Sequence, residues 1–425
     1  MLKVKAFDEV FETIDEKFCV DSVNSLNTDI KPDMLETICV TDAVGRILHN
    51  DIVSNEDVPG FDRSTVDGYT VIASDTFGAS ESIPAILNVI GDVTMGEKAD
   101  FTVNTGFCVG ISTGGDFPDG CNAAVMVEHT EDYGDGLVGI MKPVAPGNNM
   151  IFRGDDVKKG TKILKAGSVL TVSDVGILSA LGYASVDVRR SLKVGIISTG
   201  DELVPPSDVP KRGQIRDVNT PMLMAQITGF GCVAVNYGII KDEESLLNSA
   251  VLKASSECDV VLVSGGSSAG LRDLTARIIE NEGELLFHGI AIKPGKPTIL
   301  GVVNGKPVFG LPGHPVAAYF ITELFVRHLL MRMCGADFIR KSTTAKLSEA
   351  ISSNHGRAEC IPVRLATCQG SPFGAPRGQS LRLAVPVRGK SGLIATLADT
   401  QGYIIVPRDC EGIAKDETVE VFYLK

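Results

Sequence analysis

Residues 192–331 alternate between strand-like and helix-like segments, and this alternation constrains the fold more than any other feature of the sequence. Runs rich in β-branched residues begin near Lys193, Val233 and Val260, and a helix-like segment follows each of them. Such alternation is typical of a parallel α/β sheet, in which the loops at the carboxyl ends of the strands line the ligand crevice. We therefore expect the polar loops after these strands to converge on one site.

The other parts of the chain have different patterns, and 425 residues are too many for one hydrophobic core. Residues 46–145 contain short β-branched runs separated by Gly, Asp and Pro, which predict a small β domain. Residues 146–190 have a mixed pattern that could rejoin the amphipathic helix at the start of the chain. Residues 338–425 are rich in strands and turns and indicate a separate barrel or sandwich. The predicted fold class is multidomain α/β plus β.

Charge and cysteine spacing exclude several functions. The net charge of −13 argues against a general surface for nucleic acid or anionic membranes, so an anionic ligand needs a local basic pocket. The ten cysteines include no Cys-x-x-Cys pair, and the six histidines show no His-x-x-x-His spacing, so we expect no transition-metal site. The opening helix does not resemble a signal peptide and no apolar run is long enough to cross a membrane, which predicts a cytoplasmic protein.

Two of the predicted strand-end loops carry carboxylates. Residues 198–202 read Ser-Thr-Gly-Asp-Glu directly after a buried strand, and glycine there permits a tight turn. Asp242 follows the next strand, and from spacing alone it is better explained as the N-cap of a helix than as a functional carboxylate.

A third loop, residues 264–270, contains three glycines and three serines between a strand and a helix. Its backbone amides and the helix N-terminus could bind a phosphate, although a structural tight turn would have the same composition. Asp273 follows in the first helical turn, where it suits the helix dipole and is also placed to hold Mg²⁺ beside that phosphate.

Positive charge is concentrated in the Ile-Lys-Pro-Gly-Lys-Pro segment of residues 292–297. Lys293 and Lys296 would suit an anionic ligand, while the alternative is a solvated basic turn. The next turn, residues 310–315, again leads from a strand to a helix, and His314 in it is more often a polar cap than a catalyst.

Taken together, these segments resemble the molybdopterin molybdenumtransferase (MoeA) family and the related E domain of gephyrin. The strongest matches are listed in chain order: Asp62 to Tyr69, Ser198 to Leu203, Ser264 to Gly270 with Asp273, Ile292 to Pro297, and Gly310 to Pro315. Weaker matches include Ser112 to Gly114 and Arg153 to Asp156. The resemblance spans almost the whole chain.

The resemblance implies an elongated homodimer whose subunits have four domains. These would be a discontinuous linker domain for dimerisation (1–45 and 146–190), a small β domain (46–145), a three-layer α/β/α molybdopterin-binding domain (191–331) and a C-terminal β-barrel domain (332–425). The catalytic cleft would lie between the α/β domain of one subunit and the β domain of the other. Asp67 and Thr113 would then act in trans.

The resemblance also implies the reaction, a Mg²⁺-dependent insertion of molybdate into adenylylated molybdopterin with release of AMP. The implied catalytic residues are Asp67, Thr113, Glu202, Asp242, Asp273, Lys293 and Lys296, of which Glu202, Asp242 and Asp273 would hold Mg²⁺. The implied substrate-binding residues are Ser198, Thr199, Gly200, Ser264, Gly265, Gly266, Ser268, Gly270, Pro312, Gly313, His314, Pro315 and Ser391. Implied protein partners are the molybdopterin adenylyltransferase and acceptor molybdoenzymes.

The sequence departs from the family pattern at several positions, including the Gly-rich loop, which reads Ser-Ser-Ala at residues 267–269 where the family often has an apolar residue first. His314 stands where asparagine is usual, Leu271 where an acid is frequent, Leu274 where an aromatic is common, and Gly289 where some members carry lysine. These departures leave open a tungstate-preferring enzyme, or an inactive paralogue that serves as a binding scaffold. A pterin adenylyltransferase is a further alternative, but it would give the β domain and the C-terminal domain no role.

Overall fold

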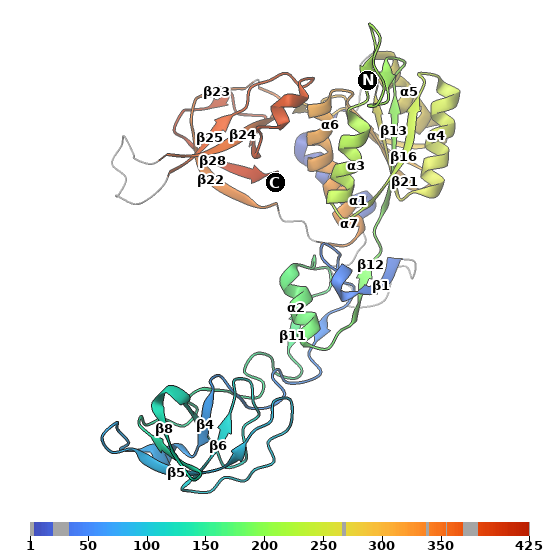
Figure 1. The fold of residues 1–425 in the computed structure, drawn as a ribbon. Coiled ribbons are helices and arrows are strands. Elements are labelled where there is room, and N and C mark those ends of the chain that lie inside the picture. Colours follow the sequence, from blue (N-terminus) through green and yellow to red (C-terminus); the bar gives the residue numbers. More distant parts are fainter. Residues whose placement is uncertain are drawn as a thin grey trace.

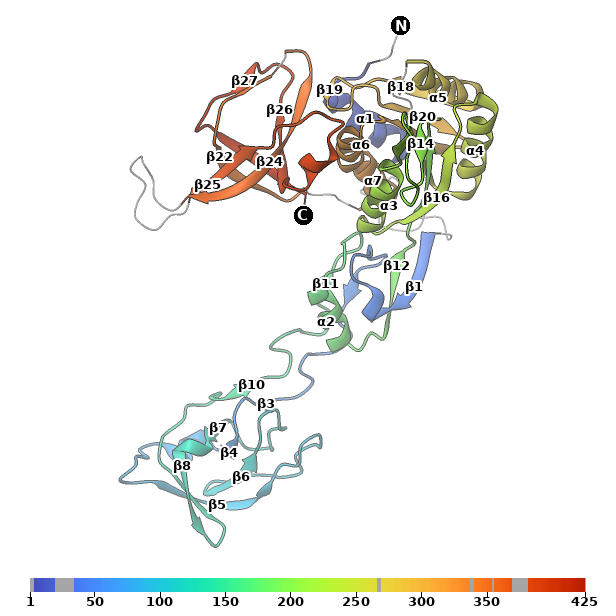
Figure 2. The same ribbon diagram turned by 45° about the horizontal axis from the view of Figure 1, so that its top comes forward.

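The computed structural model describes residues 4–19, 34–265, 269–336, 340–353, 355–368 and 381–424. The chain is elongated, with a β domain at one end and an α/β unit beside a β barrel at the other (Figures 1 and 2). A narrow segment joins the two ends. No helix in the described ranges combines the length and apolar character needed to span a bilayer.

The α/β unit is built on one six-stranded sheet with strand order β16-β13-β17-β21-β20-β18. The strands are β16 (Val233–Ile240), β13 (Lys193–Thr199), β17 (Val260–Gly265), β21 (Lys306–Leu311), β20 (Ile299–Val303) and β18 (Gly283–His288). The first four run parallel, and β20 and β18 add antiparallel pairings at one edge. The carboxyl ends of β13, β16, β17 and β21 therefore meet along one edge of the sheet.

Helices cover both faces of this sheet. The helices are α3 (Asn219–Gly229), α4 (Glu244–Glu257), α5 (Ala269–Glu282), α6 (Pro315–Ile321), the π-helical turn η5 (Thr322–Val326) and α7 (Arg327–Met333). Ile196 points into the core shared with α3 and α6, whereas its neighbour Ile197 points into the core shared with α4 and α5. A strand buried on both faces needs the continuous apolar run that the sequence shows. The predicted three-layer architecture is confirmed.

The opening helix α1 (Phe7–Phe18) packs on the α/β unit, whereas the domain boundaries given above group it with residues 146–190. Its buried Val10 and Ile14 belong to the same core as α7, and the rings of Phe7 and Phe325 lie 5.5 Å apart. The apolar stripe at helical spacing predicted the helix correctly. Periodicity shows that a helix has a buried face, but it does not identify the surface that covers that face.

Two pairs of short strands form the narrow segment. Strand β1 (Leu35–Cys39) pairs antiparallel with β12 (Ser185–Arg189), and β2 (Ile52–Val53) pairs with β11 (Lys162–Leu164). Helix α2 (Val172–Ala180) and the 3₁₀ turn η2 (Val40–Asp42) complete it. Its small core joins residues from before and after the β domain.

The β domain contains a second six-stranded sheet, with order β7-β4-β6-β5-β9-β8. These strands are β7 (Ala123–Met126), β4 (Gly68–Val71), β6 (Phe107–Ile111), β5 (Ala85–Asp92), β9 (Leu137–Ile140) and β8 (Thr130–Gly134). The short strands β3 (Arg63–Ser64) and β10 (Met150–Ile151) pair where the chain enters and leaves this domain.

The C-terminal region is a closed five-stranded barrel, which decides between the barrel and sandwich alternatives. Its strands are β22 (Ser342–Leu347), β24 (Ala358–Cys368), β25 (Leu381–Pro386), β26 (Gly402–Val406) and β28 (Thr418–Tyr423). The barrel closes because β24 pairs with both β25 and β26. Strand β19 (Ile292–Lys293) of the α/β unit pairs parallel with β24, so the barrel is hydrogen-bonded to the lysine-bearing segment.

Candidate functional site

Side-chain hydrogen bonds connect the end of β13 to the loop after β16 and to the start of α3. The hydroxyl of Thr199 is buried and donates to the Asp242 carboxylate at 2.8 Å, and the Ser198 and Thr220 hydroxyls lie 2.6 Å apart. Glu243, not Asp242, occupies the N-cap position of α4. The N-cap interpretation of Asp242 is therefore wrong, and its carboxylate lies at the strand ends.

Glu202 lies beside the same strand end. A Cβ placed on Gly200 would come within 2.9 Å of the Glu202 carboxylate, and Gly200 has a φ of +154°, so this turn requires glycine. The carboxylates of Glu202 and Asp242 therefore flank the end of β13. The described residues contain no group of three or more His, Cys, Asp or Glu side chains in metal-binding proximity. The side chain of Asp273, the third predicted carboxylate, lies outside the described part of the chain.

The loop after β17 approaches β13 closely. A Cβ on Gly265 would lie 2.1 Å from the Thr199 carbonyl oxygen, so only glycine fits there. The Nδ2 group of Asn219 donates to the Ser264 hydroxyl at 2.8 Å and to the Gly313 carbonyl at 3.0 Å. Gly266 and Ser268 lie outside the described residues, and Gly270 is described only as backbone of α5.

Asn219 is a contributor that the list of implied site residues omits. Its side chain connects the loops after β17 and β21, and its Oδ1 atom is buried without a hydrogen-bond partner in the described structure. A buried acceptor in this position can receive a donor from a ligand, because burial without a partner is costly. The sequence signal for Asn219 is its position at the start of a helix after strand β13, and it also belongs to a weaker element of the family resemblance, residues 214–217 with Asn219.

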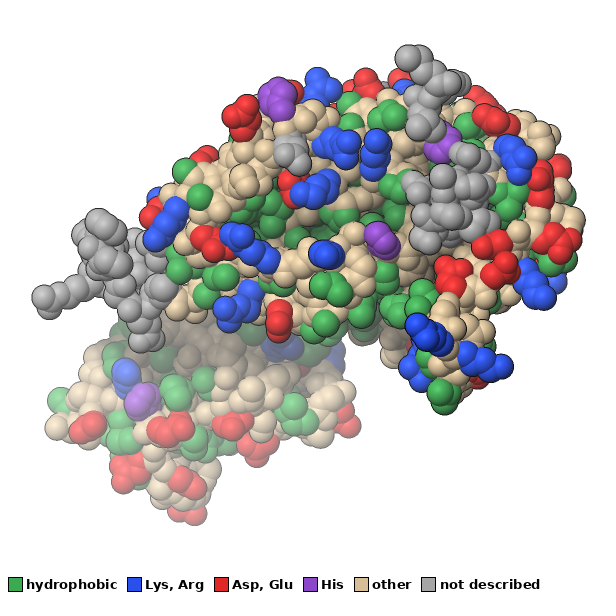
Figure 3. All heavy atoms as spheres, turned by 90° about the horizontal axis from the view of Figure 1, so that it is seen from above, with side chains coloured by type: hydrophobic (Ala, Val, Ile, Leu, Met, Phe, Trp, Pro, Cys, Tyr) green, Lys and Arg blue, Asp and Glu red, His purple; other side chains and the backbone are tan. Residues whose placement is uncertain are grey.

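A cavity of about 1040 Å³ lies between the α/β unit and the barrel. Lys and Arg side chains gather around this hollow, which has hydrophobic side chains in its floor (Figure 3). Six of the predicted residues line it: Lys293, Lys296, Pro312, Gly313, His314 and Ser391. The structure thus brings the two lysines together with the turn after β21 and with a serine from the barrel.

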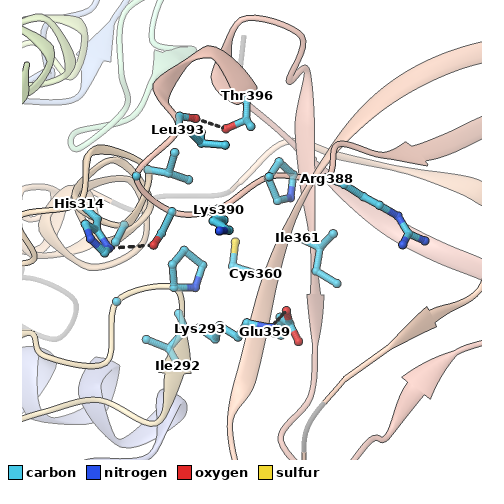
Figure 4. Close-up of a pocket in the computed structure, with 18 of the residues that line it drawn as sticks. Ile292, Lys293, His314, Glu359, Cys360, Ile361, Arg388, Lys390, Leu393 and Thr396 are labelled. Carbon is cyan, nitrogen blue, oxygen red and sulfur yellow. Dashed lines mark hydrogen bonds and ion pairs between the residues drawn. The ribbon is translucent and has the colours of Figure 1, made fainter.

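His314 links the two walls of the cavity. It occupies the N-cap position of α6, but its side chain makes no capping bond there; its Nδ1 atom lies 2.9 Å from the Ser391 hydroxyl (Figure 4). The backbone amide of Val316 also donates to the Ser391 carbonyl at 3.1 Å. These contacts hold residues 389–393 of the barrel against the start of α6.

The barrel adds charged groups that the sequence analysis did not assign. Arg357 and Lys390 line the cavity, and Lys390 lies at its centre in Figure 4. The guanidinium group of Arg388 extends away from the cavity, and its Nε atom lies 3.0 Å from Glu349. Glu359 pairs with Lys293, and burial raises the pKa of the neighbouring Cys360 thiol well above its usual value. The basic loop was visible in the sequence, but its position depends on the long-range pairing of β19 with β24.

Asp67 and Thr113 lie in the β domain, at the far end of the chain from the cavity (Figure 1). The Thr113 amide donates to the Asp67 carboxylate at 2.7 Å. Asp67 also lines a smaller cavity of about 180 Å³. Within one chain, this pair is therefore separate from the lysines and from the strand-end carboxylates.

Three family models match consecutive parts of the chain: the MoeA N-terminal region (domain I and II) at residues 7–182, the probable molybdopterin binding domain at 195–332, and the MoeA C-terminal region (domain IV) at 344–424. The chain belongs to the MoeA family. This finding confirms the resemblance that the motifs carried.

Relatives and solved structures agree with this membership. The molybdopterin molybdenumtransferase of Bacillus subtilis is 32% identical over 395 residues, covering 92% of this chain and 90% of that protein. The enzyme of the same name from Staphylococcus aureus strain COL is 31% identical over 390 residues, covering 91% and 90%. A MoeA crystal structure from Pyrococcus horikoshii covers both chains completely at 37% identity, with a TM-score of 0.79. The predictions of a transferase and of a role in molybdenum cofactor biosynthesis are confirmed.

Proposed function

We propose that this MoeA-family chain inserts molybdate into adenylylated molybdopterin, with Mg²⁺ as cofactor and with release of AMP. The observation that carries the proposal is the cavity, in which Lys293 and Lys296 of the α/β unit face Arg357 and Lys390 of the barrel. A chain with a net charge of −13 has four cations lining one hollow, which suits a substrate made of a phosphate ester and an oxyanion.

The strand-end loops supply neutral donors to the same substrate. We assign the serines and glycines after β13 and β17, with the turn of residues 312–315, to the pterin and its phosphate. The Ser264 hydroxyl and the Gly265 backbone stand at the start of the predicted phosphate loop, and amides in such loops bind anions through their N–H groups. The unpartnered Asn219 Oδ1 adds a buried acceptor for a pterin N–H group.

Carboxylates would hold the metal. Glu202 and Asp242 flank the end of β13, and carboxylate oxygens are the ligands that Mg²⁺ prefers. With Asp273 from α5 they would hold the ion, which would supply positive charge beside the phosphate that is bonded to AMP. Thr199 keeps the Asp242 carboxylate in place through its 2.8 Å hydrogen bond.

The β domain would complete the site from a second subunit. In the proposed homodimer, Asp67 and Thr113 of one chain reach the cleft of the other, where the Asp67 carboxylate orients the attacking water. The hydrogen bond from the Thr113 backbone N–H fixes the position of that carboxylate. The enzyme would work in the cytoplasm, receive its substrate from the adenylyltransferase and pass its product to acceptor molybdoenzymes.

The test is AMP release from adenylylated molybdopterin, measured with molybdate, with tungstate and without either oxyanion. We expect release that depends on molybdate, is abolished by chelation of Mg²⁺ and falls by a factor of at least about 100 in Asp242→Asn and Asp273→Asn. The matched control is Asp135→Asn, an exposed turn residue of the β domain with a positive φ that asparagine tolerates. Release with tungstate alone would establish the tungstate-preferring alternative. No release with either oxyanion would leave the scaffold alternative.

A further inference from the structure

Among the described residues that line the cavity, Glu359 is the one acidic side chain, and the other charged side chains are Lys or Arg. It lies on β24 at the position that pairs with Lys293 of β19. Its Oε1 atom is 2.6 Å from the Lys293 ammonium nitrogen (Figure 4). The Ser353 hydroxyl donates to its Oε2 atom at 2.9 Å. The same lysine is one of the groups assigned above to the anionic substrate.

The Lys293 side chain of this ion pair can move more freely than the Glu359 side chain. The Glu359 side chain is 14% exposed and is held by Ser353 and by a strand that is paired on both sides, whereas the Lys293 side chain is 57% exposed. The ammonium group can therefore move toward an anion in the cavity, while the carboxylate stays in the wall. An entering oxyanion must compete with Glu359 for the same cation.

We infer that Glu359 is a positioning residue that acts as an internal counter-ion for Lys293. Glu359 holds the Lys293 ammonium group at the cavity wall until an oxyanion draws that group away. By competing for Lys293, Glu359 also weakens oxyanion binding, so that the bound anion can leave again. This inference rests on the proposed function in assigning Lys293 to anion binding. It goes beyond that function by giving the barrel carboxylate a role opposite in sign to that of the surrounding cations.

Removal of the Glu359 charge changes oxyanion affinity in opposite directions for a counter-ion and for a residue that only holds Lys293 in place. Repulsion between a carboxylate and a dianion roughly 7 Å apart at the solvent-like end of the dielectric range corresponds to an affinity change of about threefold to tenfold. Glu359→Gln keeps the shape and the Ser353 contact but removes the charge, so oxyanions should bind about threefold to tenfold more tightly. If Glu359 only held Lys293 in a binding position, the same substitution would weaken binding.

The experiment is isothermal titration of the full chain with molybdate and, separately, with sulfate. The variants are Glu359→Gln, Glu359→Asp, which keeps the charge, and Glu420→Gln. Glu420 is a matched control because it is also a barrel-strand carboxylate bonded to a serine hydroxyl, that of Ser342 at 2.6 Å, but does not line the cavity. We expect tighter binding of both anions by Glu359→Gln alone. In the AMP-release assay this variant should show a lower KM for molybdate without a higher kcat.

Weaker or unchanged binding by Glu359→Gln, with an unfolding temperature like that of the wild type, would overturn the inference. So would a wild-type chain that binds neither anion, because a cavity without anion affinity needs no counter-ion. Failure of the proposed function has a different signature: the wild type would bind sulfate and molybdate, with the Glu359→Gln effect present, but would release no AMP.

Discussion

The β domain and the rest of the molecule differ sharply in charge. Residues 46–145 contain 16 Asp and Glu but only 4 Lys and Arg, so this segment carries −12 of the total charge of −13. The other 325 residues are almost neutral, yet they contain the cavity lined by Lys293, Lys296, Arg357 and Lys390. Attraction between an acidic domain and a basic cavity at opposite ends of one chain favours assembly of the two between chains, as the proposed homodimer requires.

Removal of both lysines from the basic cavity should have the largest effect, a loss of molybdate affinity. In Lys293→Ala/Lys296→Ala, two charge-assisted contacts are lost, each worth about 1.5 kcal/mol or more, so molybdate affinity should fall by a factor of at least about 100. Isothermal titration measures the change. Lys253→Ala on the exposed side of α4 is the control and should bind like the wild type. Near-normal affinity in the double variant would remove the cavity as the oxyanion site.

Mixed dimers test whether the acidic and basic regions act between chains. Asp67→Asn and Lys293→Ala/Lys296→Ala should each be inactive as homodimers. If the site forms in trans, subunit exchange between them should restore about a quarter of wild-type AMP release, because half of the randomly formed dimers have one intact site of two. If exchange occurs but no activity returns, the site is formed within one chain.

Raising the ionic strength should weaken the attraction between molybdate and the basic cavity, but by less than the lysine substitutions do. The Debye length falls from about 30 Å at 0.01 M to about 3 Å at 1 M, so the KM for molybdate should rise severalfold across this range. The contacts to the neutral pterin ring provide an internal control, because their contribution to substrate binding should not change with salt concentration. A KM for molybdate that is independent of salt would show that short-range hydrogen bonds, not the collective charge of the cavity, bind the anion.

The smallest expected effect concerns the contact between the two walls of the cavity. Ser391→Ala removes the hydrogen bond to His314 and should cost about 0.5–1.5 kcal/mol of unfolding free energy, measured by urea denaturation. It should also raise the KM for molybdate by less than about tenfold, because the barrel loop is then held to α6 without the His314 bond and only through the backbone bond from Val316 to residue 391. Ser342→Ala loses a comparable bond inside the barrel and should change stability alone. Equal KM values in the two variants would show that the His314 contact is only structural.

Local sequence patterns predicted the α/β unit and its strand-end loops because each part depends on nearby residues. The apolar run before Ser198 and the glycines at 200 and 265 fix the strand ends and their turns, and the structure places them as expected. Asp242 was misjudged for the same reason, since an acid before a helix resembles an N-cap and its real partner, Thr199, is 43 residues away.

The barrel side of the cavity could not be predicted from the sequence because distant segments form it. Glu359 meets Lys293 only through the pairing of β19 with β24, and His314 meets Ser391 over 77 residues. The sequence shows neither contact, because hydrophobic periodicity specifies which face of a strand is buried but not which strand lies beside it. The motif resemblance supplied Ser391, and physical reasoning from the residues alone would have left it out.

The packing of α1 sets the order in which parts of the chain can fold during synthesis. Asp15 contacts His328 and Arg332 at 2.8 and 2.9 Å, over separations of 313 and 317 residues. While the ribosome is still making the α/β unit, the β domain has already emerged and can fold as a unit, but α1 has no partner for Phe7 and Phe11. Helix α1 leaves the exit tunnel before the α/β unit is complete and is thus among the last elements to dock, so Phe7 and Phe11 are exposed to chaperones until α7 has been made.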